Sequence, residues 1–373
     1  MARFAAMAET LPRLSIAQVA PPLEPVPPPG YGGLERVVNE LLIELQRRGH
    51  EVTLFASGDS TAPVSTIATV ERALRPAGLV DRFAPWTVST ALDAIGRSGE
   101  FDIVHAHLEW LNVLFARACP TPVVATFHGR LDTPEAAALL RYAPPGMVAI
   151  SQAQADTRPE VDWSGVVHNG LTLGRAPIRE RPGDALCFVG RLGPEKGAAD
   201  AIEIARLAGR HLRMALKPAA LRSERGYEEN VLKPALKGAD VELIGELSER
   251  ERDALMADSW ATLMPGNWPE PFGLVAIESL ACGAPVIARP VGGVPEIVRD
   301  GIDGFLADKN AEMAAAVERV GGLDRLAIRA SVIDRFSAAR MTDGYEAAYA
   351  RRLGLPDIPI QPDMRGQFTD PAR

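Results

Sequence analysis

The chain has 373 residues, of which 47% are hydrophobic and 24% charged, and a formal net charge of −8. This length exceeds that of a single hydrophobic core and predicts two domains. The negative charge argues against a nucleic-acid-binding protein, because such proteins depend on clustered lysine and arginine. The three cysteines (Cys119, Cys187 and Cys282) are widely spaced, which fits a reducing compartment rather than a disulfide-bonded protein.

Nothing in the sequence predicts a membrane protein. No apolar stretch reaches the roughly 18–20 residues of a membrane span. Residues 1–13 carry no long apolar segment before a small-residue cleavage site, so a signal peptide is not predicted. We expect a cytoplasmic protein with at most peripheral contact with a membrane.

The first half of the chain is predicted to alternate between strands and helices. A short apolar strand at 14–20 is followed by a loop rich in proline and glycine and then by a helix at 34–49, whose apolar residues recur every three or four positions. Further strands are predicted at 51–57, 101–107, 122–128 and 147–151. They are nearly continuous apolar runs, which are typical of parallel strands covered on both faces.

A second, similar series begins after the Pro-, Gly- and Arg-rich segment 171–184, which we interpret as a linker. Its predicted elements, in chain order, are a strand at 185–190, a helix at 198–208, strands at 212–217 and 241–246, a helix at 248–257, a strand at 261–265, a helix from about Phe272 and a strand at 285–290. The sequence therefore predicts an α/β protein of two Rossmann-like, doubly wound domains, residues 1–175 and 176–345, facing a cleft.

In open α/β sheets, ligands bind at the carboxyl ends of the strands, so polar residues there indicate function. In "VGRLGPEKG" (189–197), Arg191 and Lys196 lie between a strand end and a helix start. Helix N-termini attract anions, and two nearby cations suit a diphosphate. A solvated turn with two surface cations is the alternative.

Glycines and histidines mark the strand ends of the first domain. Gly32 and Gly33 in "YGGLE" allow close approach of the backbone to a ligand, although they also fit a plain structural turn. His105 and His107 are two residues apart, so both point to one face of a strand. We expect one of them to face the cleft, and the alternative is that one or both are core residues. His128 in "TFHGR" is a second candidate for the cleft.

The stretch "EPFGLVAIE" (270–278) carries two glutamates. Prolines on either side keep Glu270 outside the helix, and Gly273 leaves the N–H groups at the helix start open to an anion. A carboxylate beside a phosphate is repelled by it, so Glu270 and Glu278 are expected to accept hydrogen bonds from hydroxyls on either side of the phosphates. A nucleotide sugar has such an arrangement. The alternative is a surface charge near a helix start and a solvated helix residue.

No metal site or cofactor is predicted. The chain has no Asp-x-Asp pair to hold a cation bridging a diphosphate, and its histidines and cysteines show no spacing typical of metal ligands. The positive charge beside the phosphates would come from Arg191 and Lys196.

The ordered set "PPGYGGLERVV", "HAH", "HNG", "VGRL…KG", "EPFGLVAIESLACGAPVIA" and "GGVPEIVRDGIDGFL" resembles glycosyltransferase family four, the retaining enzymes of the GT-B architecture. The resemblance covers most of the chain. It implies that the first domain faces the acceptor and that the second binds a nucleotide sugar. It also implies that 337–349 belong to a last helix that crosses back onto the first domain, so that 346–373 form its end and a tail.

The resemblance also implies site roles. His107 and Glu270 would act on the transferred sugar, Glu278 would bind the ribose, and Glu246 and Leu247 would border the base. The diphosphate would be held by Arg191, Lys196, Gly33, Gly273 and Leu274, and the sugar or acceptor side would include Gly32, His128 and Phe272. One departure concerns "MALKPAAL" (214–221), where many relatives carry a glycine-rich turn; here Lys217 supplies a further cation near the phosphates.

The resemblance thus predicts a retaining, metal-independent glycosyltransferase. A UDP-sugar is the favoured donor and a GDP-sugar the next, while the acceptor (a glycan, a lipid-linked or a small molecule) is open. We favour same-face attack, because no carboxylate is an evident nucleophile. Two alternatives share the architecture: a nucleotide-sugar 2-epimerase, and a catalytically silent module that binds a nucleotide sugar.

Overall fold

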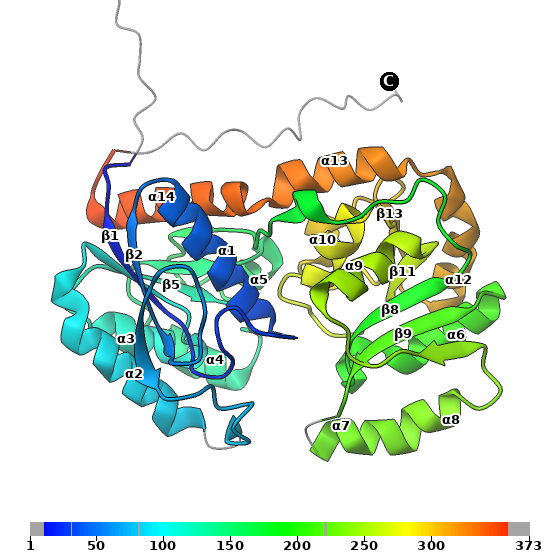
Figure 1. Cartoon of the computed structure of the whole chain (residues 1–373), viewed down its shortest axis with the longest axis horizontal. Helices are drawn as coiled ribbons and strands as arrows, with labels where there is room; N and C mark the ends of the chain where they lie inside the picture. The colour runs from blue at the N-terminus through cyan, green and yellow to red at the C-terminus, as the bar shows by residue number, and fades with distance from the viewer. Residues whose placement is uncertain (1–10, 31, 81–82, 220–221, 357–373) are drawn as a thin grey trace, which may run out of the picture.

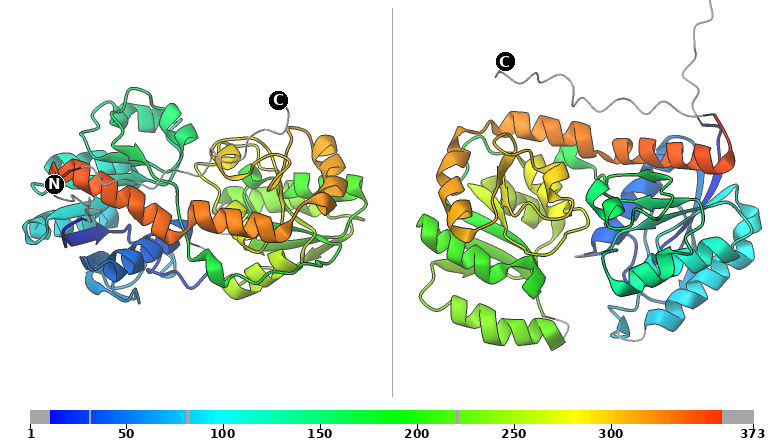
Figure 2. Two further views of the ribbon diagram at one scale, coloured as in Figure 1. Left: turned by 90° about the horizontal axis from the view of Figure 1, so that it is seen from above. Right: turned by 180° about the vertical axis from the view of Figure 1, so that it is seen from behind.

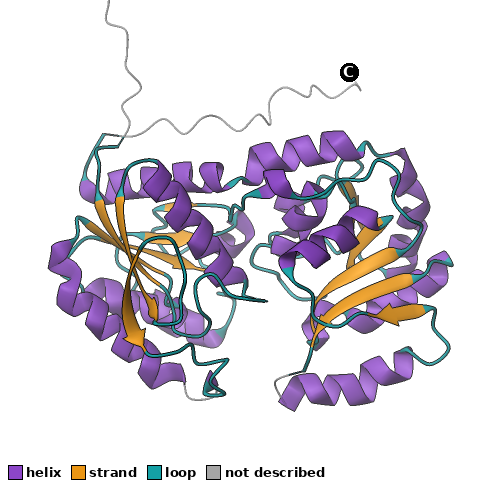
Figure 3. Ribbon diagram, in the orientation of Figure 1, coloured by secondary structure: helices purple, strands orange, loops and turns teal. Residues whose placement is uncertain are grey.

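The computed structural model describes residues 11–30, 32–80, 83–219 and 222–356. It contains two parallel sheets, one in each half of the chain, with helices on both faces (Figures 1 and 3). This arrangement confirms the predicted fold class of two Rossmann-like α/β domains.

The first sheet has seven strands in the order β3-β2-β1-β4-β5-β6-β7. Their bounds are Ser15–Val19 for β1, Glu51–Ser57 for β2, Ser65–Val70 for β3, Ile103–Ala106 for β4, Val123–Phe127 for β5, Met147–Ala149 for β6 and Gly165–Val166 for β7. The helices between them are α1 (Gly33–Arg47), α2 (Phe83–Arg97), α3 (Asn112–Ala118), α4 (Pro134–Leu140) and α5 (Gln152–Asp156). The order reverses at β1, and at this switch point the carboxyl ends of β1 and β4 open towards the second domain.

The second sheet has six strands in the order β10-β9-β8-β11-β12-β13. Their bounds are Leu186–Arg191 for β8, Leu212–Lys217 for β9, Val241–Leu243 for β10, Ala261–Met264 for β11, Val286–Ala288 for β12 and Gly304–Leu306 for β13. The helices are α6 (Ala198–Ala208), α7 (Arg222–Tyr227), α8 (Lys233–Ala235), α9 (Glu249–Asp258), α10 (Leu274–Ala281), α11 (Val294–Ile297), α12 (Asn310–Arg319) and α13 (Arg325–Phe336).

The last helix, α14 (Ala338–Leu353), returns to the first domain. Figure 2 shows α13 and α14, in orange and red, running one after the other along the same side of both domains. Arg48, just after α1, holds α14 through Asp343 at 2.8 Å and Glu346 at 2.5 Å. Because Tyr345 and Tyr349 of α14 are completely buried against the first sheet, α14 forms part of the N-terminal core.

Three strands were not predicted from the sequence. They are β3, β7 and β13, which are short or, like β3, only partly buried. Such strands lack the continuous apolar run from which buried parallel strands are recognised. Within the described part of the chain, no helix is long and apolar enough to cross a membrane.

Candidate active site

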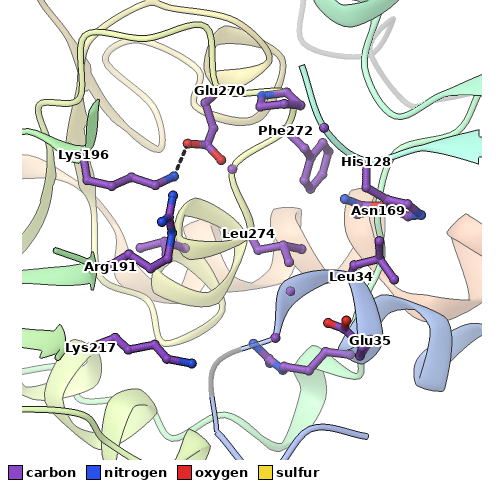
Figure 4. A pocket seen from close by; sticks show the side chains of 18 of the residues that line it. Leu34, Glu35, His128, Asn169, Arg191, Lys196, Lys217, Glu270, Phe272 and Leu274 are labelled. Carbon is purple, nitrogen blue, oxygen red and sulfur yellow. Dashed lines mark hydrogen bonds and ion pairs between the residues drawn. The ribbon is translucent and has the colours of Figure 1, made fainter. Parts of the chain in front are cut away.

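A pocket of about 640 Å³ lies between the two domains. One wall comes from the loop after β1, the start of α1 and the ends of β4 and β5. The other comes from β8, β9 and the start of α10. Figure 4 shows cationic side chains reaching in from the C-terminal domain, opposite Glu35, His128 and Asn169 of the N-terminal domain. The strand ends of the two sheets thus meet here, as expected for ligand sites in this class of fold.

Arg191, Lys196 and Lys217 line the C-terminal wall (Figure 4). Arg191 ends β8 and pairs with Glu224 and Glu195, each at 2.6 Å. Lys217 ends the neighbouring strand β9. Because β8 and β9 are adjacent and parallel, with Arg191 opposite Lys217, their final side chains place two cations at the same edge of the pocket.

Glu270 lies in the loop before α10, outside the helix as predicted from its flanking prolines. Its Oε2 accepts hydrogen bonds from Lys196 Nζ at 2.5 Å and from Trp268 Nε1 at 2.9 Å. The Lys196 ammonium also lies 4.8 Å from the centre of the Trp268 ring. Both bonds use one carboxylate oxygen, so the other oxygen, Oε1, is left for a ligand.

The start of α10 comes close to the N-terminal domain. Gly273 caps this helix with a φ of 117°, a conformation that side chains with a Cβ rarely adopt. Across the pocket, a Cβ on Gly33 would come within 3.0 Å of Leu274 Cδ1. Glycine at 273 therefore permits the helix start, and glycine at 33 permits the close approach of the two domains.

Glu278 is buried in α10, with only 5% of its area exposed, and carries an ion pair between the domains. Its Oε1 contacts Arg36 of α1 and lies 2.9 Å from Arg252 of α9. Glu278 still lines the pocket. Its Oε2 has no partner among the described residues, so one oxygen again remains for a ligand.

His107, predicted to act on the transferred sugar, does not line the pocket in this structure, and its role stays a prediction. Its side chain is completely buried and does not line the pocket. Both ring nitrogens are occupied, Nδ1 at 2.9 Å from His128 and Nε2 at 2.9 Å from Gln18. The reason is that the backbone at His107 still pairs with β1, its N–H donating to the carbonyl of Val19 at 2.9 Å, so the side chain lies inside the sheet. His128, which follows β5, lines the pocket instead.

Glu246 and Leu247, predicted to border the base, do not line the pocket. Glu246 lies 3.8 Å from Lys217 Nζ, and its carboxylate would contact a Cβ on Gly30. Leu247 packs against the hydrophobic cluster that contains Leu255. An apolar side chain gains by this burial. The contact of these two residues with the base stays a prediction.

The other predicted residues come together in one pocket. The members that line it are Gly32, Gly33, His128, Arg191, Lys196, Glu270, Phe272, Gly273, Leu274 and Glu278. Most of these residues could be assembled from the sequence because they lie near a strand end or a helix start, whereas Glu278, inside α10, was placed by the family resemblance.

Two glutamates of the N-terminal wall were not predicted. Glu109 accepts hydrogen bonds from the backbone N–H groups of His128 at 3.0 Å and Gly129 at 3.1 Å. Its backbone has a φ of 52°, unusual for a residue other than glycine. Glu109 therefore fixes the turn that carries His128, and strain at such a position is typical of functional sites. Its place after "HAHL" gave no sign of this role.

Glu35 lies in the first turn of α1 and lines the pocket with only 5% of its area exposed. Burial, together with the nearby Glu24 and Glu109, raises the pKa of Glu35 from 4.5 to about 7. The folded protein therefore binds this proton more tightly than the unfolded chain. As a result, the free energy of unfolding falls as pH rises from about 4.5 to about 7.

Replacing Glu35 by glutamine is expected to remove this pH-dependent loss of stability, because glutamine does not titrate. The melting temperature of Glu35→Gln relative to the wild type should therefore increase between pH 5 and pH 8. The control is Glu312→Gln, which removes a carboxylate whose side chain is 51% exposed. If the melting temperatures of Glu35→Gln and the wild type differed by the same amount at pH 5 and pH 8, the raised pKa of Glu35 would be contradicted.

Comparisons with known proteins define the class. Residues 31–173 match the family model "Glycosyltransferase Family 4", and residues 178–323 match "Glycosyl transferases group 1". The fold, the pocket and these matches define a glycosyltransferase of the two-domain GT-B architecture. The protein is thus a family-four-like glycosyltransferase, with the two family models each covering one of its domains.

Curated relatives agree with this class. The chain is 28% identical over 347 residues to a glycogen synthase of Mycobacterium tuberculosis, with 79% of this chain and 83% of the relative covered. It is 29% identical over 393 residues to a D-inositol 3-phosphate glycosyltransferase of Mycolicibacterium gilvum, with 88% and 87% covered.

Solved structures share the fold. The crystal structure of AviGT4, a glycosyltransferase involved in avilamycin A biosynthesis, superposes with a TM-score of 0.70 at 24% identity, covering 93% of this chain and all of that one. Anabaena HepE in complex with UDP-glucose superposes with a TM-score of 0.68 at 18% identity, covering 92% of this chain and all of that one.

Proposed function

We propose that this glycosyltransferase transfers a sugar, with retention, from a nucleoside-diphosphate sugar, without a metal ion. The observation that carries the proposal is the row formed by Glu270, the start of α10 and Glu278 along one wall of the pocket. Each glutamate keeps one carboxylate oxygen without a partner in the described structure, on either side of a helix start that attracts anions. A sugar, a diphosphate and a ribose fit this order.

The C-terminal wall supplies the remaining contacts of the donor. Arg191 and Lys196 would hold the diphosphate together with the backbone at Gly273 and Leu274, and Lys217 would add a third cation. Glu270 would bind hydroxyls of the sugar, and Glu278 those of the ribose. Of His107 and His128, His128 is the one that lines the pocket. We therefore propose that His128, rather than His107, contacts the transferred sugar. UDP is the favoured nucleotide, because the HepE structure with the same fold holds UDP-glucose.

The chemistry follows from charge. The bond between the anomeric carbon and the phosphate oxygen breaks, and its electron pair leaves with the diphosphate. The cations and the helix start stabilise this charge as it forms. The acceptor oxygen bonds to the anomeric carbon, and its proton passes to the leaving phosphate. A pocket between two domains also limits hydrolysis by excluding water.

We propose same-face attack rather than a covalent intermediate. Glu270 already binds Lys196 and Trp268, and Glu109 binds two backbone N–H groups. Carboxylates held in this way stabilise and position groups. A nucleophile, by contrast, must be free to approach the anomeric carbon. In the described part of the chain, no group of three His, Cys, Asp or Glu side chains is arranged to hold a metal ion.

A donor screen tests the proposal. Release of nucleoside diphosphate from UDP-, GDP-, ADP- and dTDP-sugars is measured with EDTA present, and the products are analysed by NMR. We expect turnover of a UDP-sugar that magnesium or manganese does not increase, and a product with the anomeric configuration of the donor. Epimerised nucleotide sugar without an acceptor would instead indicate the 2-epimerase, and binding without turnover would indicate the silent module.

The charge of the N-terminal wall bears on the acceptor. Its cations, Arg36 and Arg75, pair with Glu278 and Glu24 respectively, and Glu35 and Glu109 add two carboxylates. Because burial raises the pKa of Glu35 and of Glu109 to about 7, what disfavours a phosphate here is that both cations are already paired with carboxylates, so we propose an acceptor without a phosphate, in contrast to the inositol phosphate relatives.

Acceptors built on the same sugar but carrying different charges test this point. With the best donor, D-glucose and D-glucosamine are expected to be better acceptors than D-glucose 6-phosphate by at least about tenfold in kcat/KM. In Glu35→Gln, the difference in kcat/KM between these sugars and D-glucose 6-phosphate should be smaller. A preference for the phosphorylated sugar would contradict the proposed acceptor class.

A further inference from the structure

Behind His128 lies a chain of buried polar side chains that the catalytic roles above do not use. His128 Nε2 is 2.9 Å from His107 Nδ1, and His107 Nε2 is 2.9 Å from Gln18 Oε1. Gln18 Nε2 donates to the hydroxyl of Tyr349 at 3.1 Å. Gln18, His107 and Tyr349 are all completely buried. This series of hydrogen bonds therefore links the pocket to α14, the last helix of the described residues.

The direction of each hydrogen bond follows from Gln18. Its carbonyl oxygen can only accept, so His107 must carry its proton on Nε2. Burial holds the pKa of His107 well below its ordinary value, so the ring is neutral and its Nδ1 has a lone pair. His107 Nδ1 can therefore only accept, and His128 must donate to it from Nε2.

His128 is consequently left with one free nitrogen. Burial lowers its pKa to about 3, so the ring is neutral at physiological pH. With the proton on Nε2, Nδ1 is a hydrogen-bond acceptor. Nδ1 has no partner among the described residues, and His128 lines the pocket (Figure 4).

The hydrogen bonds beyond Tyr349 run in the same direction. Tyr349 accepts from Gln18, so its own proton is free to go to His105 Nδ1 at 2.8 Å. His105 Nε2 then donates to Thr126 at 2.8 Å, and Thr126 donates to Tyr345 at 3.3 Å. All the donors point the same way, and aligned hydrogen bonds of this kind strengthen one another.

We propose that Gln18, His107 and Tyr349 are positioning residues that hold His128 in its Nε2–H tautomer, so that Nδ1 accepts a hydrogen bond from a hydroxyl of the transferred sugar. This inference rests on the proposed function for the identity of that sugar. In this tautomer His128 orients a hydroxyl and gives no proton to the leaving phosphate.

Two tyrosines of α14 provide a matched pair of variants. Tyr349→Phe removes the acceptor of the Gln18 amide. The amide is then free to rotate and donate to His107, which reverses the chain and moves the proton of His128 to Nδ1. Tyr345→Phe removes a hydroxyl one turn away on the same helix, at the far end of the chain, and should leave His128 unchanged. Gln18→Met interrupts the chain at its centre and serves as a second test.

The tautomers are read from ¹⁵N NMR of the histidine rings, with His128 assigned from His128→Gln. In the wild type we expect a neutral Nε2–H ring at pH 7, and in Tyr349→Phe and Gln18→Met a shift towards Nδ1–H. With the best donor, kcat of Tyr349→Phe should fall about tenfold, as for one lost hydrogen bond to a ligand, with the donor KM within about twofold. Tyr345→Phe should match the wild type in both measurements.

A charged or Nδ1–H His128 in the wild type would overturn the proposal. If Tyr349→Phe and Tyr345→Phe had the same His128 tautomer and the same kcat, the positioning role of Gln18, His107 and Tyr349 would be overturned. Failure of the wild type to use any nucleotide sugar would instead overturn the proposed function, and the NMR measurement would still decide the tautomer.

Discussion

Replacing Glu270 by glutamine is expected to lower kcat/KM for the nucleotide sugar at least about a hundredfold, the size of effect seen when one donor or acceptor that acts in the transition state is lost. Glutamine keeps the shape of the side chain but removes the charge that holds the Lys196 ammonium, 2.5 Å away. It also presents an N–H group where a carboxylate oxygen accepts from Trp268 or from a sugar hydroxyl. Steady-state kinetics with the best donor measures the change.

A double-mutant cycle with Lys196→Ala makes this prediction sharper. Because Glu270 and Lys196 are in contact, the double variant should lose less than the product of the two single losses. Glu312→Gln, far from the pocket on α12, is the control and should retain wild-type turnover. Wild-type kinetics for Glu270→Gln would show that this glutamate does not contact the donor.

Replacing Glu278 by alanine is expected to reduce stability as well as donor binding. The carboxylate is the partner of two largely buried guanidinium groups, Arg36 and Arg252, whose side chains are 14% and 10% exposed. Without Glu278, among the described carboxylates Arg36 keeps only Glu249 at 3.6 Å and Arg252 only Asp253 at 3.8 Å, and removing the close partner of a buried charge costs about 3–5 kcal/mol. Urea unfolding should show a loss of this size, and a titration with the donor should show weaker binding.

Glu249 offers a matched control for this variant. Its carboxylate lies 3.6 Å from the same Arg36, but its side chain is 65% exposed. Exposed ion pairs contribute at most about 1 kcal/mol, so Glu249→Ala should change stability by less than that and leave donor affinity unaltered. Equal losses for Glu278→Ala and Glu249→Ala would show that the buried ion pair between the domains does not stabilise the fold.

The fold and most of the pocket could be predicted from the sequence because both depend on short local patterns of residues. Buried parallel strands are continuous apolar runs, and the polar residues at their ends converge by topology. Glu270 and Gly273 could be placed because the flanking prolines and the positive φ of a helix start are local properties.

Contacts between distant segments could not be predicted in the same way. His107 and His128 both follow an interior strand, and His107 is the buried one because its ring lies between the side chains of Gln18 in β1 and His128 after β5. Arg36 and Glu278, which form an ion pair, are 242 positions apart. Gln18 and Tyr349, which form a hydrogen bond with each other, are 331 positions apart. A single sequence carries no pattern for such pairs, because each depends on how two domains and a returning helix are packed.

The account depends most on the claim that the C-terminal wall binds a diphosphate without a metal ion. Calorimetric titration in EDTA, with the nucleoside, the monophosphate and the diphosphate of the best donor, measures this directly. We predict that the diphosphate binds at least about tenfold more tightly than the monophosphate, and the nucleoside more weakly than either. We also predict that Lys196→Ala removes most of the gain from the second phosphate. Equal affinities for all three, or diphosphate binding only with added metal, would contradict the account.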